Sequence, residues 1–375
     1  MIGSAQWALG PAESGHSEQR RVFGLMDMNC FRSWVAAAGP GQLRSPFQRL
    51  PLRACLVLGL LVASGCGRDA SQPLAMKLGH VAAPGSLVSD TAEDFARRAN
   101  ERLAGRAHID VFGSSQLGGD ETLLVKLRLG TVDFSLPSTV MSSTIEAFGI
   151  FEMPYLIKDR QHMLRVEEKV FWPHIAPGAE KLGFKVLSVW ENGFRHITND
   201  VRPIVEPGDL SGIKLRTPRG AWRVRLFQSF GANPTPMPLE EVFVALQTGV
   251  LDGQENPFSQ IHSQRFQEVQ RFLSLSNHVY SPGYLLTGKE HWERLPADIR
   301  EQVEAAAQET KLYVLRRAEE LDRQLLETLK ESGIAVNEVD RESFVKASEA
   351  IYKEFGEAVP GGRQWIDEAL ALDAL

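Results

Sequence analysis

The sequence is poor in cysteine and lacks the common motifs of catalytic and metal sites. It has three cysteines in 375 residues, and because Cys66 is the last, the chain beyond it can form no disulfide and no thiolate metal site. It contains no P-loop, no His-Glu-x-x-His, no Gly-x-Ser-x-Gly and no strand followed by Gly-x-Gly-x-x-Gly. The nine histidines lack metal-ligand spacing, and a lone one such as His196 is typical of a hydrogen-bonded structural residue. These absences favour a protein without a cofactor that catalyses no reaction.

The composition and charge indicate a globular, acidic body. Hydrophobic residues make up 43% and charged residues 23% of the chain, which is ordinary for a globular fold and enough for two domains. Residues 1–65 contain six arginines and three acids, so the net charge of −6 leaves −9 on the remainder. An acidic body argues against nucleic acid as a partner, because binding phosphates needs a basic face. A small anionic ligand is still compatible with it, since a single pocket can be locally positive.

The N-terminal region has the features of an export signal. Two arginines precede a twelve-residue apolar run at 54–65. A helix of that length reaches about 18 Å, too short for a hydrocarbon layer of about 30 Å. A signal peptide fits better, so residues 1–65 are interpreted as a leader that is removed. Residues 1–48 show no period, which suggests a translation start further along the chain, at Met26 or Met28.

The leader ends in a sequence that resembles the lipobox of bacterial lipoproteins. Ala63-Ser-Gly-Cys66 would be cleaved before the cysteine, and Cys66 would then receive acyl chains that anchor the protein to the membrane. The lipobox prefers leucine where this chain has Ala63, so cleavage after Ala63 or Gly65 without lipidation stays open. Residues 66–74 are predicted to form a tether.

The start of the body predicts a parallel sheet. Residues 76–80 and 108–112 have the alternation of strands, and residues 89–103 between them carry apolar side chains at helical spacing. A strand, a helix and a second strand in this order favour a parallel pair, and with it an α/β fold.

Two distant segments repeat one pattern. A predicted helix at 121–129 is followed by Gly130 and, three residues later, by an aspartate. The helix predicted near 239–248 is followed by Gly249 and again by an aspartate three residues later. Each glycine stands where the end of a helix needs a positive φ. The repeat predicts two similar lobes, each presenting a loop and a helix N-terminus to a shared cleft, where free N–H groups favour an anion.

A long helix is predicted near the C-terminal end. Apolar residues keep helical spacing through 296–332, where Pro296 suits a first turn and Gly333 a helix end. Unbroken, this helix would be roughly 54 Å long, which exceeds one lobe and predicts that it lies across both. The alternative is two shorter helices broken near Lys311.

Arg216 stands where a strand ends. It follows the alternating residues 212–215, and Pro218 ends the run because proline cannot donate to a ladder. In open α/β sheets ligands bind at strand ends, and a guanidinium fork fits a carboxylate with two parallel hydrogen bonds. The alternative is a surface arginine whose stem covers apolar neighbours.

Arg195 and Asn256 are further candidates for a binding site. Arg195 follows the apolar strand 184–189, and Asn256 follows a glycine that permits close approach of the backbone. Together with Arg216 they would converge on one acid. The alternatives are a surface salt bridge for Arg195 and an Asx-turn before a proline for Asn256.

From about Met76 to about Phe355 the sequence resembles the solute-binding proteins of TRAP transporters. A Leu-Arg-x-Pro motif followed by Asp-Gly-Gln-Glu-Asn-Pro is highly specific in combination. The segments that carry the resemblance are Leu210–Pro218, Pro234–Met237, Glu241–Gln247, Asp252–Pro257, Ser115–Gly118, Met153–Leu156 and Asn192–Arg195.

The resemblance implies an α/β, two-lobed, periplasmic-binding-protein-like fold of the type II kind, with hinge strands and a long helix that spans both lobes. The first lobe would comprise residues 75–193 and 282–320, and the second 194–281 and 321–375. The protein would deliver an organic acid to the membrane subunits of a TRAP permease driven by an ion gradient.

The resemblance also implies roles for four residues. The arginine of the Leu-Arg-x-Pro motif, Arg216, would clamp the ligand carboxylate. Arg195 and Asn256 match further pocket positions of the family, and Asp120 matches another in the loop after Gln-Leu-Gly. Closure of the lobes would then bury the ligand among these side chains.

The sequence departs from the sialic-acid-binding members of the family at three pocket positions. It has Val81, Pro137 and Leu239 where those members have asparagine, glutamate and an aromatic residue. Sialic acid is therefore not expected, and a dicarboxylate or a smaller sugar acid suits two arginines better. Two other classes stay open: the ligand-binding partner of a sensor kinase or chemoreceptor, and an enzyme built on the same fold.

Overall fold

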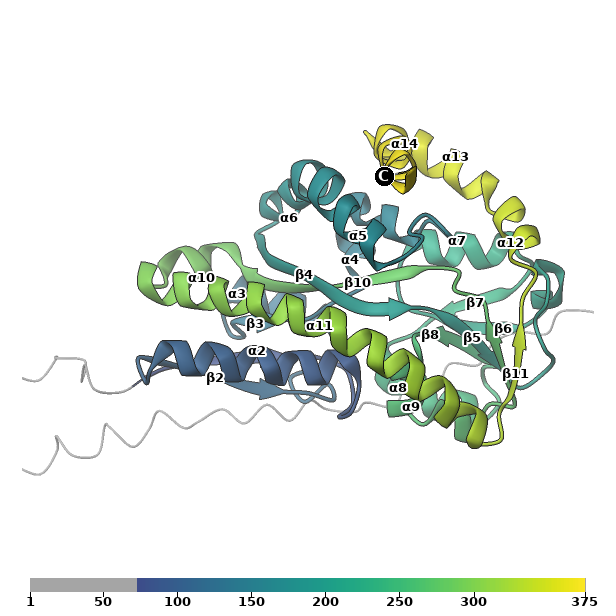
Figure 1. Ribbon diagram of the computed structural model, residues 1–375, viewed down its shortest axis with the longest axis horizontal. Helices are drawn as coiled ribbons and strands as arrows, with labels where there is room; N and C mark the ends of the chain where they lie inside the picture. Colours follow the sequence, from purple (N-terminus) through teal and green to yellow (C-terminus); the bar gives the residue numbers. More distant parts are fainter. Residues whose placement is uncertain (1–72, 375) are drawn as a thin grey trace, which may run out of the picture. The chain divides into compact units, whose positions relative to one another are not determined.

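A computed structural model describes residues 73–374. The predicted leader, most of the tether and the lipidation candidate Cys66 lie outside the described residues. Two β-sheets form the centre of the described part, each flanked by helices (Figure 1). The α/β class and the division into two lobes are therefore confirmed.

The sheet of the first lobe has five strands in the order β2-β1-β3-β10-β4. β1 pairs in parallel with β2 and β3, and β10 runs antiparallel to β3 and β4. The predicted strand–helix–strand start is confirmed, since helix α2 connects the parallel strands β1 and β2. The strands are β1 (Leu74–Gly79), β2 (Ala107–Phe112), β3 (Phe134–Ser135), β4 (Phe184–Phe194) and β10 (Tyr280–Gly288).

The sheet of the second lobe has six strands in the order β11-β9-β5-β8-β6-β7. β6 is parallel to both neighbours, whereas β5 is antiparallel to β8 and β9. The strands are β5 (His196–Asn199), β6 (Lys214–Thr217), β7 (Asn233–Pro236), β8 (Gly253–Asn256), β9 (Phe272–Leu275) and β11 (Ala335–Glu338).

The chain crosses between the two sheets three times. β4 ends at Phe194 and β5 begins at His196, so one nearly continuous strand serves both sheets. A short connection joins β9 to β10, and helix α11 leads from the first lobe to β11. The first crossing falls at the boundary predicted from the sequence, while the assignment of helices to lobes stays a prediction.

Helix α11 is the long helix that the sequence predicts. It runs unbroken from Ala297 to Glu331 over 35 residues, so the alternative of two helices broken near Lys311 is wrong. It contacts α2 and β4 of the first lobe and α9 of the second, and Figure 1 shows it running diagonally across the molecule. Its buried residues recur at helical spacing, from Ile299 to Leu329, which explains why one helix can cover both lobes.

The repeat seen in the sequence has the same geometry in both lobes. Gly130 and Gly249 end their helices with φ of 67° and 71°. Asp133 accepts a hydrogen bond from the backbone N–H of Lys77 at 2.7 Å, and Asp252 accepts one from that of Lys214 at 2.9 Å. Asp133 therefore binds the middle of β1, and Asp252 the start of β6, in its own sheet.

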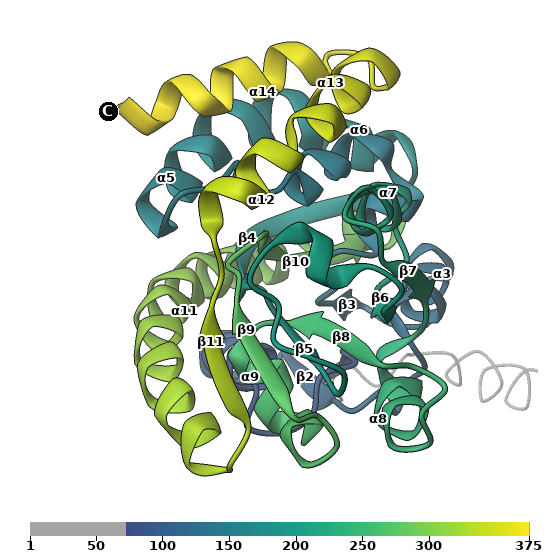
Figure 2. The same ribbon diagram turned by 90° about the vertical axis from the view of Figure 1, so that its right-hand side faces the viewer.

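Helices cover both faces of the sheets. α2 and α11 share one hydrophobic cluster with α8 and α9, and a second cluster joins α5, α7 and the C-terminal helices. Figure 2 shows α13 and α14 at one end of the molecule, above α5, and α13 also contacts α7 of the second lobe. The α-helices are α2 (Leu87–Leu103), α3 (Asp120–Leu129), α4 (Met141–Thr144), α5 (Arg160–Val166), α6 (Ala176–Lys181), α7 (Ala221–Ser229), α8 (Leu239–Gln247), α9 (Phe258–Ser263), α10 (Lys289–Arg294), α12 (Arg341–Ala347), α13 (Glu349–Ala358) and α14 (Gly362–Ala371).

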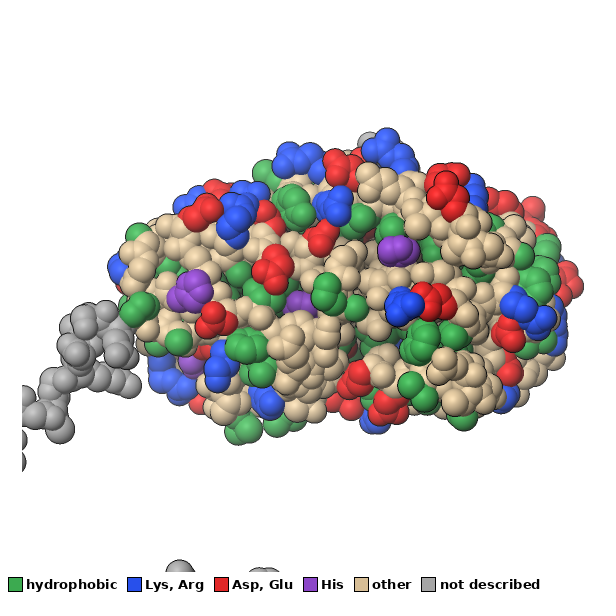
Figure 3. Space-filling model, turned by 90° about the horizontal axis from the view of Figure 1, so that it is seen from below, with side chains coloured by type: hydrophobic (Ala, Val, Ile, Leu, Met, Phe, Trp, Pro, Cys, Tyr) green, Lys and Arg blue, Asp and Glu red, His purple; other side chains and the backbone are tan. Residues whose placement is uncertain are grey.

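The surface carries mixed charge. On the face seen from below, acidic and basic side chains are interspersed and no broad basic patch appears (Figure 3). Within residues 73–374 no helix is both long enough and apolar enough to cross a membrane. The same residues contain no cluster of three or more histidine, cysteine or acidic side chains that would hold a metal ion.

Candidate ligand-binding cleft

A cleft with a cavity volume of about 60 Å³ lies between the two lobes. Its wall comes from the strand ends and connections of both sheets, which is where an α/β sheet binds its ligands. A second hollow adjoins it and shares Asp120, Arg216 and Leu239 with it. The lining residues of the cleft are Val81, Ala82, Val88, Asp120, Leu136, Ser138, Thr139, Val140, Asn192, Arg195, Arg216, Pro218, Leu239, Asn256 and Gln260.

Arg216 is buried at the cleft and held in one orientation. Leu215 belongs to the core beside α7, so the alternation of β6 turns Arg216 to the opposite face. The Arg216 guanidinium donates to the carbonyl oxygen of Met237 from Nε at 2.9 Å and from Nη2 at 2.6 Å. This leaves the edge formed by Nη1 and Nη2 without a partner among the described residues. That edge presents two parallel N–H groups, the geometry that a carboxylate accepts.

The charge of Arg216 lacks a bonded counter-ion within residues 73–374. Its side chain is 3% exposed, and burial lowers the pKa of its guanidinium to about 9, so it stays charged at neutral pH. A buried cation without a partner is unfavourable until an anion arrives. The alternative of a surface arginine is therefore wrong.

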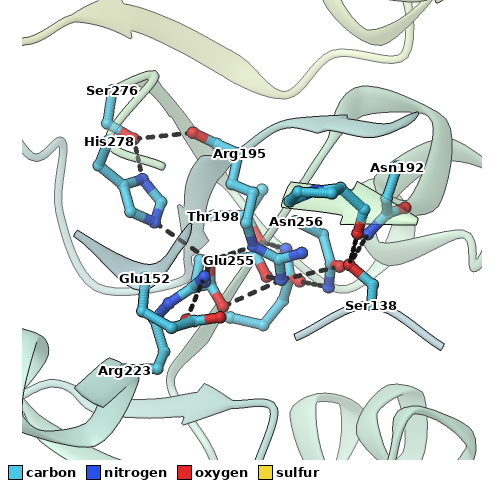
Figure 4. Close-up of polar contacts among 12 residues, drawn as sticks. Ser138, Glu152, Asn192, Arg195, Thr198, Arg223, Glu255, Asn256, Ser276 and His278 are labelled. Carbon is cyan, nitrogen blue, oxygen red and sulfur yellow. Dashed lines mark hydrogen bonds and ion pairs between the residues drawn. The ribbon is translucent and has the colours of Figure 1, made fainter. Parts of the chain in front are cut away.

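Arg195 lines the same cleft but has its own counter-ion. It donates from Nε to Glu255 Oε2 at 2.5 Å and from Nη2 to Asn256 Oδ1 at 3.0 Å. Figure 4 shows its guanidinium between these two residues. With 2% exposure it forms a buried ion pair, not the surface salt bridge considered as an alternative.

Glu255 is the centre of a buried charged network that the sequence did not reveal. Besides Arg195, it accepts from Arg223 Nη1 at 2.5 Å, and His278 Nε2 lies 3.1 Å from it (Figure 4). Arg223 also pairs with Glu152 at 2.6 Å. Burial alone would raise the pKa of Glu255, but the charges of Arg195 and Arg223 outweigh it and lower that pKa well below its usual range. Two arginines and two glutamates thus neutralise each other behind the cleft.

Asn256 is fixed by neighbours on its own sheet. Its Oδ1 accepts from Arg195, and its Nδ2 donates to Gln254 Oε1 at 2.5 Å. These partners exclude the Asx-turn considered from the sequence. The prediction that Arg195, Arg216 and Asn256 come together is met, since all three line one cleft.

The N-termini of two helices face the cleft, as the repeat predicts. Asp120 begins α3 and Leu239 begins α8, and both line the wall. Burial, with Glu240 nearby, raises the pKa of the Asp120 carboxyl to about 7, against the opposing effect of Arg216. The Oδ1 atom of Asp120 is buried and has no hydrogen-bond partner within residues 73–374.

The two other positions that distinguish this chain from sialic-acid-binding members differ in their placement. Val81 contributes an apolar part of the wall. Pro137 lies between the lining residues Leu136 and Ser138 but is not itself part of the wall, and its carbonyl accepts from the backbone N–H of Tyr284 at 3.0 Å. Pro137 therefore shapes the loop that carries the lining residues.

Polar residues from β4, α9 and the connection after β3 complete the cleft. Asn192 Nδ2 donates to Ser138 Oγ, and Gln260 Nε2 donates to Asn192 Oδ1, each at 3.5 Å. Thr139 and Gln260 each keep one buried oxygen without a partner in the described part of the chain. These residues could not be predicted from the sequence, because a single serine, threonine or amide side chain has no periodic pattern.

His196 belongs to a different cavity. Its ring stacks on Phe258 with centroids 3.9 Å apart, and burial lowers its pKa to about 3. The cavity that it lines shares no residue with the cleft, and its Arg160 is already paired with Glu191 and Asp322. His196 is therefore a neutral packing residue, although its Nδ1 lacks the predicted hydrogen bond to any described residue.

A two-lobed α/β fold with a free guanidinium edge in the cleft between its lobes is typical of periplasmic-type solute-binding proteins. Residues 78–358 match the family described as bacterial extracellular solute-binding protein, family 7. The chain therefore belongs to this family, the solute-binding proteins of TRAP transporters.

Relatives with a described ligand span most of this chain. The chain is 32% identical over 258 residues to the 2,3-diketo-L-gulonate-binding periplasmic protein of Escherichia coli K12, covering 68% of this chain and 79% of that one. A TRAP periplasmic solute-binding protein from Polaromonas sp. JS666, bound to D-erythronate, has 32% identity and a TM-score of 0.76, over 80% and 98% of the chains. One from Sulfurospirillum deleyianum with bound succinate has 31% identity and a TM-score of 0.76, over 80% and 99%.

Proposed function

We propose that the protein captures an organic acid, of the C4-dicarboxylate or sugar-acid type, outside the cytoplasm and delivers it to a TRAP permease driven by an ion gradient. The observation that carries this proposal is the unpaired edge of the buried Arg216 guanidinium in the cleft between the lobes. The ligands named for the relatives, a diketo sugar acid, an aldonate and succinate, all contain a carboxylate that such an edge accepts.

Binding and closure would be coupled through contacts that need both lobes. The ligand carboxylate pairs with Arg216 on the second lobe, and each charge-assisted hydrogen bond in a desolvated site contributes about 1.5–3 kcal/mol. The first lobe adds Asp120, Ser138 and Thr139 only when it approaches. Because these contacts exist only in the closed state, the ligand favours closure.

Delivery to a permease implies a protein held near the membrane. Lipidation at Cys66, after cleavage of the leader, would anchor it there, and the tether would let the body reach the membrane subunits. Mass spectrometry of the membrane-associated protein tests this step: diacylglycerol on Cys66 supports the anchor, and a mature chain that starts after Ala63 or Gly65 contradicts it.

The direct test of the function is a thermal-shift screen against organic acids, followed by calorimetry. A ligand that binds only the folded state raises the melting temperature by mass action. The expected result is saturable binding of at least one carboxylate and of none of the matching neutral alcohols. Recovery of the acid intact after incubation would show binding without catalysis. Uptake of the acid after reconstitution with permease subunits would favour transport over the alternative of a sensor-kinase or chemoreceptor partner.

A further inference from the structure

The cations at the cleft can neutralise one negative charge of a ligand, not two. Arg195 and Arg223 are neutralised by Glu255 and Glu152, as described above. At the mouth of the adjoining hollow, Arg219 Nε lies 3.3 Å from Glu121 Oε1. Among the cations that line the cleft and the hollow, Arg216 is therefore the one left without a bonded counter-ion in the described chain.

The wall of the cleft also carries buried oxygens that lack a partner in the described chain. Three buried oxygens have no hydrogen-bond partner within the described chain: Asp120 Oδ1, Thr139 Oγ1 and Gln260 Oε1. Glu240 adds a further carboxylate at the hollow. Leaving a buried polar atom unpaired is unfavourable. Asp120 and Gln260 offer acceptor oxygens, whereas the Thr139 hydroxyl can donate or accept, so a ligand group that both donates and accepts satisfies all three.

A hydroxyl group supplies such donors and a carboxylate does not. An ionised carboxylate only accepts hydrogen bonds, so a second one placed near Asp120 and Gln260 would meet the Gln260 acceptor and, wherever Asp120 is ionised, a like charge. A hydroxyl donates its proton to one of these oxygens and brings no charge. The apolar residues of the wall, among them Val81, Leu136 and Leu239, suit the carbon chain of the ligand.

Resting on the proposed function, we propose that the ligand is a monocarboxylic acid with several hydroxyl groups, of the aldonate kind, and not a dicarboxylate. Its one carboxylate pairs with the Nη1–Nη2 edge of Arg216. Its hydroxyls donate to Asp120, Thr139 and Gln260.

The test compares acids of equal carbon number by calorimetry at pH 7.5. Erythronate, a pentonate and gluconate are each set against succinate, glutarate and adipate, with butyrate as the acid without hydroxyls. We expect at least one hydroxy acid to bind at least about tenfold more tightly than the dicarboxylate of the same length and than butyrate, the factor of one to two hydrogen bonds.

Two variants test which side chains cause the preference for a hydroxy acid over a dicarboxylate. Thr139→Val removes the hydroxyl at nearly constant volume and should weaken the hydroxy acid about three- to tenfold, and succinate by a smaller factor. The matched control is Thr287→Val in β10, a threonine that is equally buried and equally without a partner but does not line the cleft. Asp120→Asn removes a negative charge. It should strengthen the binding of succinate and so reduce the difference in affinity between the hydroxy acid and succinate.

The outcomes separate this inference from the proposed function. A dicarboxylate that binds more tightly than every hydroxy acid overturns the inference and leaves the proposed function standing. Equal affinities for butyrate and erythronate would also overturn the inference, because the hydroxyl groups would then contribute nothing to binding. If no acid of any set binds, both fail together.

Discussion

Arg219 Nε lies 3.3 Å from Glu121 Oε1, and the two residues belong to opposite lobes. Ser115 Oγ and Glu240 Oε2, 3.5 Å apart, form a second polar contact between the lobes. Both contacts exist only when the lobes have approached each other, so the structure has a closed arrangement. They lie beside the cleft but outside the group that holds the carboxylate.

These contacts predict a change in ligand release. In Arg219→Gln the closed state loses an exposed ion pair worth about 0.2–1 kcal/mol, so we expect dissociation to become up to about fivefold faster. Association should change little, because it starts from the open state. Stopped-flow fluorescence measures both rates. Arg363→Gln removes a similarly exposed ion pair on α14 and serves as the control; an equal effect in the control would contradict a role at the cleft.

Arg216 provides the sharpest test of the site. Arg216→Lys keeps the charge but replaces the fork with an ammonium, which cannot bond the Met237 carbonyl and a carboxylate with parallel N–H groups. We expect affinity for the cognate acid to fall by at least about tenfold, equivalent to one charge-assisted hydrogen bond. The exposed Arg316→Lys on α11 should bind as the wild type does. Calorimetry decides the matter, and unchanged affinity in Arg216→Lys would remove this residue from the site.

The buried network behind the cleft predicts a large effect on stability. Glu255→Ala leaves Arg195 and Arg223 both buried beside each other, with Glu152 as the remaining acid, and breaking a buried ion pair typically costs about 3–5 kcal/mol. Urea unfolding measures the loss. Glu354→Ala breaks the exposed pair with Arg225 and should cost under about 1 kcal/mol. A similar small loss in both variants would show that the network does not hold the fold together.

The sequence predicts the architecture well because its signals are local. The alternation before Arg216, the repeated helix-glycine-aspartate pattern and the apolar stripe of α11 each depend on neighbours within one element. They correctly place Arg216, Arg195 and Asn256 at one cleft and identify both helix N-termini that face it.

The charged network could not be predicted in the same way. Glu152, Arg223, Glu255 and His278 come from separate elements up to 126 residues apart, and nothing near each one indicates its partner. Arg223 lies in α7, where a periodic pattern alone would place a charged residue on the solvent face. Only the packing of α7 against the second sheet buries it, so the neutralisation of Arg195, and with it the charge available to a ligand, becomes visible only in three dimensions.

The raised pKa of the Asp120 carboxyl leads us to expect that ligand affinity depends on pH. That pKa is raised to about 7 by burial and by Glu240 and Glu121, while Arg216 opposes this shift. A bound carboxylate neutralises Arg216 and adds a like charge, so it raises the Asp120 pKa further and binding takes up a proton. Affinity should therefore be constant below about pH 6 and fall as the pH rises through 7, by at most about tenfold per unit for a single group. Calorimetry at pH 6, 7, 8 and 9, in buffers of different ionisation enthalpy, measures both the affinity and the proton uptake.

The variant Asp120→Asn isolates this titration. Its amide cannot ionise, so affinity should become nearly independent of pH between 6 and 8, below the pKa of about 9 of the Arg216 guanidinium, and over that range the calorimetric enthalpy should no longer depend on the buffer. His278, whose pKa burial lowers to about 4, stays neutral throughout this range and cannot produce the effect. A slope that persists in Asp120→Asn would assign the proton to another group, whereas a flat wild-type profile would show that Asp120 does not change its protonation when the ligand binds.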